Sequence, residues 1–237
     1  MEDNVSKSGF DKSNKENVPT DGNTINFDSK FISTHYRLIE AIFFLQVLHV
    51  LKEAQGQHGL KHGDYQRYRG YCSRRLMRIR KSLHYVQSSG GKRSAFQSKK
   101  ITGQMVYEAD KNNKDPIRYL LIPLMEAERA WAYAMQLKQE ANTEQRKKFH
   151  LVRRLKKAVK SAQVLESFCN DEPTRCDART KLESQAYAAY FNGLFYFETE
   201  EWQKAAEFFK KAQTIYQKIF ETIEDEEIAN CYKQRCD

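Results

Sequence analysis

The chain has 237 residues, enough for one main hydrophobic core, and 40 Lys and Arg against 31 Asp and Glu give it a formal net charge of +9. Only 4 Pro and 10 Gly interrupt a composition rich in Leu, Ala, Glu, Lys and Arg, which favours long helices over many short strands. The 5 Cys are an odd number and the polar N-terminal stretch lacks the apolar segment of a secretory signal, which argues against a disulfide-stabilised secreted scaffold.

The first part of the chain is predicted to be a tail followed by a buried helix. Residues 1–30 are polar and are expected to be disordered, whereas residues 31–237 are expected to form one α-helical domain. A first helix is predicted over residues 31–55. Its apolar stretch at 38–51 is shorter than the ~20 residues that a bilayer requires and contains polar side chains, so we expect an amphipathic helix without membrane insertion.

A second helix is predicted over residues 65–85, with Asp64 as its N-cap because a carboxylate there can accept a hydrogen bond from the first turn. Residues 87–100 combine Gly, Ser and Lys without periodicity, which is typical of an exposed, flexible loop. A short helix is expected after this loop, near residues 104–109.

Asp115 and Pro116 are typical of a helix start and predict a helix that extends to residue 141. Within it, Pro123 predicts a kink or a break near Leu121, because proline has no N–H and its ring clashes with the preceding turn.

The C-terminal part is predicted to consist of further helices. Asn142 with Gln145 resembles a capping box for a helix that extends to residue 168. Two more helices are expected at residues 178–198 and 202–220, and a last one from about residue 224.

The pair of helices at 178–220 carries the spacing of a tetratricopeptide repeat, in which small residues let two helices approach and aromatic residues fill the space between them. The matching residues are Gly193, Tyr196, Ala205, Phe209 and Ala212. No second clean copy follows at the period of the repeat. We therefore predict an all-α, irregular tetratricopeptide-like bundle, with a generic helical hairpin as the alternative.

The helix predicted over 65–85 has two opposite faces. Residues 61–100 hold 12 Lys and Arg against one Asp, a local excess of +11. An apolar stripe recurs at steps of three and four: Tyr65, Tyr68, Cys72, Leu76, Ile79 and Leu83. A basic stripe lies about 180° away at 100° per residue: Arg67, Tyr71, Arg74, Arg78, Lys81 and Tyr85, with Arg69, Arg75 and Arg80 at its edges.

The basic stripe predicts a polyanionic partner. A merely solvated helix face usually mixes Glu with Lys, because like charges four residues apart repel. The guanidinium group of Arg can also bond phosphate with two parallel hydrogen bonds and stack on bases. We therefore expect nucleic-acid contact, with Tyr71 and Tyr85 either as stacking platforms or as packing residues.

A second basic run, "RKKFHLVRRLKKAVK", repeats this pattern more weakly. Its predicted apolar face consists of Leu151, Leu155, Ala158, Ala162 and Leu165, and its basic face of Arg146, Arg153, Lys157 and Lys160. This helix is expected either to follow the nucleic-acid backbone or to be balanced by acidic helices.

RNA is the favoured partner, since the chain has no zinc-finger spacing, no basic-zipper heptads and no dimer device for palindromic DNA. The candidate RNA-binding residues are Lys61, Arg67, Arg69, Tyr71, Arg74, Arg75, Arg78, Arg80, Lys81, Tyr85, Lys92, Arg93, Lys99 and Lys100. A secondary set is Arg146, Lys147, Arg153, Arg154, Lys157 and Lys160.

Chemistry-bearing motifs predict neither a metal site nor an enzyme. His58 and His62 are separated by Gly59, and no second Cys completes a ligand set with Cys72. The sequence also lacks a Gly-rich phosphate loop and a recognisable nucleophile motif. We therefore expect a non-catalytic protein without a cofactor.

The stretch "QHGLKHGDYQRYRGYCSRRLMRIRK", together with "RYLL", "AERAWAYAMQLKQEANTEQRKKFHLVRRLKKAVK" and "TKLESQAYAAY", resembles the family of 68-kilodalton subunits of the eukaryotic signal recognition particle. The resemblance begins near Leu45, whereas "THYRLIEAIFF" at residues 34–44 has no counterpart in the family. The longer C-terminal part of family members is absent here.

The resemblance implies a tetratricopeptide-like RNA-binding domain in the cytoplasm, and in the nucleolus during particle assembly. In the family this domain binds the three-way junction of the particle's RNA and remodels it by inserting an arginine-rich helix into the major groove. The particle also contains a 72-kilodalton partner, bound through the C-terminal part missing here, and engages the ribosome during protein targeting to the endoplasmic reticulum. The alternative function is a tetratricopeptide-like scaffold that binds acidic partner proteins.

Overall fold

The computed structural model describes residues 46–85, 99–111, 116–141, 144–171, 176–223, 226, 229–230 and 232–233. All of these belong to one compact unit of the chain, residues 38–237. The predicted tail at 1–30, most of the predicted helix at 31–55 and the loop residues Lys92 and Arg93 lie outside the described residues.

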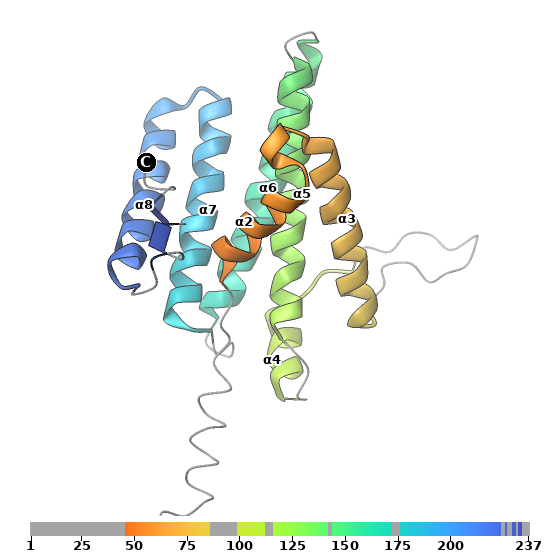
Figure 1. Ribbon diagram of the computed structural model, residues 1–237, viewed down its shortest axis with the longest axis vertical. Coiled ribbons are helices and arrows are strands. Elements are labelled where there is room, and N and C mark those ends of the chain that lie inside the picture. The colour runs from red at the N-terminus through yellow and green to blue at the C-terminus, as the bar shows by residue number, and fades with distance from the viewer. Residues whose placement is uncertain are drawn as a thin grey trace, which may run out of the picture. The chain divides into compact units, whose positions relative to one another are not determined.

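The regular elements in the described part of the chain are helices, as the composition predicted (Figure 1). They are α2 (Val47–Gln57), the 3-10 turn η1 (Leu60–His62), α3 (Tyr65–Ser82), α4 (Gly103–Lys111), α5 (Ile117–Ala141), α6 (Arg146–Asn170), α7 (Ala178–Glu198) and α8 (Trp202–Glu221). The predicted bounds of α4, α7 and α8 agree with these within two residues. Helix α3 ends three residues earlier than predicted.

Helices that follow each other along the chain pack side by side. Helix α5 packs along α6, α6 along α7 and α7 along α8, while α3 lies against α5 (Figure 1). Fully buried side chains fill the interface between the two central helices, including Leu120, Leu124 and Ala127 of α5 and Ala158 and Leu165 of α6. Their spacing of three and four residues gives each helix one continuous apolar face.

Pro123 does not break its helix. Helix α5 runs from Ile117 to Ala141 with Pro123 inside it, so the predicted break near Leu121 is wrong. Both neighbours of Pro123, Ile122 and Leu124, are buried in the core. Burial of this long apolar face compensates for the missing backbone donor, because packing contributes more to helix stability than local propensity does.

Helix α6 begins later than the capping-box prediction. Its N-cap is Gln145, whose side chain makes no capping hydrogen bond, and Asn142 lies outside the described residues. The amides of Lys147 and Lys148 instead donate to the carbonyls of Glu144 and Gln145, at 2.9 and 3.0 Å. These tight backbone bonds satisfy amides that the predicted side-chain cap was expected to bind.

The close approach predicted for the last helical pair is present. A Cβ added to Gly193 of α7 would lie 2.7 Å from the Phe209 ring of α8. Tyr196 stacks on Phe208 with ring centroids 5.4 Å apart, and Ala205 and Ala212 are buried. The α7–α8 pair therefore packs as the tetratricopeptide spacing predicted.

Candidate nucleic-acid interface

The start of α3 is fixed by a side-chain cap. The Asp64 carboxylate accepts a hydrogen bond from the Arg67 amide at 2.8 Å, which confirms the predicted N-cap. Gly59 and Gly63 adopt φ values of +102° and +68°, in the left-handed region that favours glycine. These two turns reverse the chain after α2, and α3 follows them along α5 (Figure 1).

The apolar stripe of α3 faces the core as predicted. Its buried members are Tyr68, Cys72, Leu76 and Ile79. The Tyr68 hydroxyl donates to the Glu128 carboxylate of α5 at 2.7 Å. Burial, followed by the nearby charge of Glu128, raises the pKa of the Cys72 thiol to about 12. This cysteine is therefore a protonated core residue and not a reactive thiol.

The opposite face of α3 is exposed and basic. Arg67, Arg74, Arg78 and Lys81 are all exposed, which confirms the predicted phase of the helix. Met77 lies among them with 70% of its surface exposed, and a shallow hollow is lined by Arg74, Met77, Arg78 and Lys81. The sequence reasoning missed Met77, although its position one residue before Arg78 could have placed it on this face.

The arginines at the edges of α3 are already engaged by α5. The Arg69 guanidinium lies 4.4 Å from the centre of the Tyr133 ring, and Arg154 of α6 lies 4.6 Å from the same ring. Arg80 donates to the Glu126 carboxylate. These contacts fix the side chains and attach α3 to α5, so Arg69 and Arg80 have structural roles in addition to any RNA contact.

Tyr71 and Tyr85, the two predicted stacking platforms, occupy different environments. Tyr71 is half-buried and stacks on His58 with centroids 3.7 Å apart. Tyr85 is buried, so its predicted place on the outward face is wrong. The reason is that α3 ends at Ser82 and the chain then turns through His84, which has φ +53°, so the helical phase no longer applies to Tyr85.

His58 also reports the electrostatic field of this face. Burial is the main cause that lowers the pKa of His58 below 6.5, and the nearby positive charges of Arg67, Arg74, Arg78 and Arg75 lower it further. A neutral imidazole therefore stacks on Tyr71 at neutral pH, beside a concentration of positive charge.

Helix α6 supplies the second basic surface. Its predicted apolar residues are buried, namely Leu151, Leu155, Ala158, Ala162 and Leu165. The predicted basic residues Arg146, Arg153, Lys157 and Lys160 are exposed. Within the described part of the chain, Arg153, Lys157 and Lys160 make no ion pair, so their charges remain available for phosphate.

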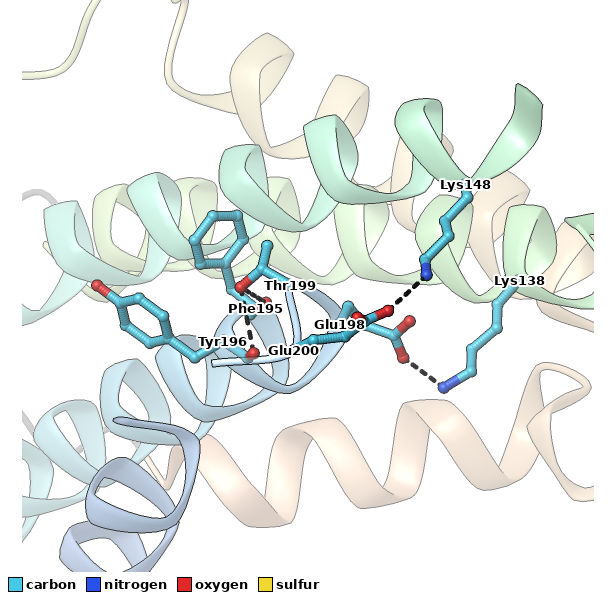
Figure 2. Close-up of polar contacts among 7 residues, drawn as sticks. All are labelled: Lys138, Lys148, Phe195, Tyr196, Glu198, Thr199 and Glu200. Carbon is cyan, nitrogen blue, oxygen red and sulfur yellow. Dashed lines mark hydrogen bonds and ion pairs between the residues drawn. The ribbon is translucent and has the colours of Figure 1, made fainter. Parts of the chain in front are cut away.

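Other lysines near the α6 N-terminus are neutralised by carboxylates. Lys147 lies 3.0 Å from Glu140 and 2.8 Å from Glu144. Figure 2 shows Lys148 paired with Glu200, at 2.8 Å, and Lys138 with Glu198, both at the corner between α7 and α8. Acidic residues therefore balance this end of α6, which was the alternative prediction for the helix.

The remaining candidates lie at the margins of the basic surface. Lys61, Lys99 and Lys100 are exposed, whereas Arg75 is partly buried. The described basic side chains that are exposed thus gather on α3, on the segment before α4 and on α6.

Comparison with known proteins identifies the family. The model of the RNA-binding signal recognition particle 68 family matches residues 60–237, which include α3 and all later helices. The chain belongs to this family. The family is described by RNA binding and particle membership, not by a reaction, and this confirms the prediction that the chain is not an enzyme.

Several relatives of the signal recognition particle 68 family carry the name signal recognition particle subunit SRP68. The one from Drosophila melanogaster is 49% identical over 187 residues, 78% of this chain and 29% of the relative. The one from Caenorhabditis elegans is 40% identical over 195 residues, 81% of this chain and 30% of the relative. The chain thus spans less than a third of the length of these relatives.

A solved structure has the same fold. The chain is similar to the structure of the SRP68-RBD from Chaetomium thermophilum with a TM-score of 0.64 and 23% sequence identity, covering 82% of this chain and 96% of that one. This likeness confirms the predicted fold class of the family domain. Among the described helices, none is long and apolar enough to cross a membrane.

Proposed function

We propose that this chain is an RNA-binding domain that binds the signal recognition particle RNA at a three-way junction, through the exposed face of α3. The observation that carries this proposal is the separation of charge on α3. Arg74 and Arg78 are exposed opposite the buried residue Leu76, so their guanidinium groups can reach a ligand without disturbing the core.

Helix geometry favours a junction over a regular duplex. The major groove of A-form RNA is too deep and narrow for side chains to read, so an arginine-rich helix requires a bulge, loop or junction that widens it. Because α3 is anchored to α5 through Arg69 and Arg80, it presents a fixed surface. A fixed cationic helix favours RNA conformations that match it, and the domain thereby remodels the junction.

The exposed lysines of α6 and of the segment before α4 extend the proposed RNA path. Lys157 and Lys160 would follow the RNA backbone, as would Lys99 and Lys100, because all four are exposed and cationic. The predicted contacts of Lys92 and Arg93 belong to the same path. The domain boundaries that we propose are a tail at 1–30 and an RNA-binding domain at 31–237.

The wider role follows from the family. In the particle, this domain would act beside the 72-kilodalton subunit and contribute to ribosome binding and protein targeting to the endoplasmic reticulum. Its place would be the cytoplasm, and the nucleolus during particle assembly.

A comparison of α3 variants tests the function. Arg74→Ala and Arg78→Ala should each weaken binding to a three-way-junction RNA by about 1–3 kcal/mol, with little change in melting temperature. Leu76→Ala should instead cost about 2–5 kcal/mol of stability, because it opens a cavity beneath the helix.

The control is a plain RNA duplex of equal length, which wild type should bind more weakly and without a distinct footprint. Equal affinities of wild type, Arg74→Ala and Arg78→Ala for the junction, with all three folded, would refute the proposed role of α3.

A further inference from the structure

A hollow of about 310 Å³ lies between the end of α3, the start of α4, and helices α5 and α6. Ligand pockets begin at about 300 Å³, so this volume suits one planar ring system and not a stack of several. Its apolar lining consists of Ile101, Ile122, Pro123, Val164 and Phe168. Four exposed lysines also line it: Lys99, Lys100, Lys157 and Lys160.

This combination distinguishes a nucleotide from a bare phosphate. A phosphate gains nothing from Ile122, Val164 or Phe168, since apolar surface stabilises only an apolar or aromatic group. A nucleobase can cover that surface with its ring while its phosphates remain at the lysines. Single-strand binding sites combine the same two features, an apolar or aromatic platform and a cationic path for the backbone.

Pro123 gives the hollow a hydrogen-bond acceptor. Proline has no N–H, so the carbonyl oxygen of Tyr119 lacks the donor that position 123 would supply in a regular helix. Residues four apart lie on one face of a helix, and Pro123 lines the hollow. The Tyr119 carbonyl is therefore on the side of α5 where an exocyclic amino group of a bound base could donate to it.

We propose that this hollow binds one unstacked RNA nucleotide whose base carries an exocyclic amino group, with its phosphates on Lys157 and Lys160. The inference rests on the proposed RNA-binding function and adds a site that reads a base. Nucleotides at a junction are already unpaired, so extruding one costs little. Arg80 belongs both to α3 and to the lining of the hollow, which makes the site continuous with the basic helix.

The test couples the hollow to one nucleotide. A three-way-junction RNA is prepared with each unpaired base removed in turn, and the affinities of wild type and Val164→Trp are measured by fluorescence anisotropy. Removal of one base should weaken wild-type binding by about 5- to 150-fold, as expected for one stacked base. Val164→Trp, which fills the hollow, should bind the intact RNA more weakly by a similar factor and should be insensitive to removal of that base.

Two further variants keep the test decisive. Gln163→Trp places the same large side chain on an exposed position of α6 and should behave as wild type. Ile101→Ala removes apolar surface from a half-buried position and should reduce the coupling even if Val164→Trp does not fold. Free adenosine monophosphate should not displace the RNA at micromolar concentration, because the site needs the neighbouring phosphates.

Pro123→Ala tests the proposed base preference. It restores the N–H at position 123, so the melting temperature should rise while the preference for adenosine or cytidine over uridine at the coupled position is lost. Junction binding by wild type with no coupled position at all would overturn the hollow and leave the proposed function standing. Absence of wild-type junction binding would overturn both.

Discussion

The hydroxyl of Tyr68 donates a 2.7 Å hydrogen bond to the carboxylate of Glu128, and both residues are buried. The same carboxylate accepts from the Tyr187 hydroxyl of α7 at 2.8 Å and from the Gln55 amide of α2 at 3.0 Å. One carboxylate on α5 therefore joins the back of the basic helix to two other helices. Three donors compensate for the cost of burying it.

Tyr68→Phe should lower the free energy of unfolding by about 1–3 kcal/mol, because Glu128 loses a donor in the core. The folded variant should bind RNA as wild type does, since Tyr68 is on the inner face. Urea denaturation and RNA titration would measure these quantities. Tyr187→Phe is a matched control that removes one donor from the same carboxylate on the side away from α3, and it should cost a similar amount.

Arg78→Ala and Arg80→Ala should have different effects although the residues are two positions apart. Arg80 is 14% exposed and bonded to Glu126, so its removal should cost about 1–3 kcal/mol of stability. Arg78 is exposed, so its removal should leave the melting temperature unchanged and weaken RNA binding. Calorimetry on both variants would measure the contrast, and equal melting temperatures would contradict it.

RNA affinity should fall steeply as salt increases, because each phosphate contact releases counterions. Lys157→Gln should reduce the slope of log affinity against log salt by about 1. Lys147→Gln is the control, since Lys147 is paired with Glu140 and Glu144 and should leave the slope unchanged. A salt-independent affinity for wild type would exclude binding driven by phosphate contacts.

Neutral His58 should stabilise the fold only above the window in which it titrates. Burial, and then the arginines of α3, lower its folded pKa below 6.5, so between these values the unfolded chain binds more protons. Stability is therefore complete above pH 6.5 and decreases as the pH falls through the lowered pKa.

RNA should raise the pKa of His58, because phosphates neutralise Arg67, Arg74 and Arg78. A histidine NMR titration with and without junction RNA would measure the shift. The same pKa in both states would mean that RNA does not bind beside this face.

Gly193→Ala should destabilise the α7–α8 pair, since its Cβ would lie 2.7 Å from the Phe209 ring. The overpacking penalty of about 1–3 kcal/mol exceeds the gain of about 1 kcal/mol in helix propensity. The double variant Gly193→Ala with Phe209→Leu should recover stability relative to Gly193→Ala alone. Thermal melts of the set would show whether the ring causes the loss.

The sequence by itself determined the two faces of α3. Helical periodicity places Leu76 and Arg74 on opposite sides whatever the helix packs against, because each residue advances the chain by a fixed rotation of about 100°. The same local rule placed the basic residues of α6 and the close approach at Gly193. The spacing of the signal recognition particle 68 family motifs was also readable without a fold.

Only the tertiary structure decided which basic residues are engaged and where a ligand could enter. Arg80 meets Glu126 across 46 residues of sequence, and Tyr68 meets Glu128 across 60, so no local pattern predicts either partner. Tyr85 lies outside the reach of helical phase because the chain turns at His84. The hollow lined by Ile101, Pro123 and Val164 exists only where three separate segments pack together, since its walls come from distant parts of the chain.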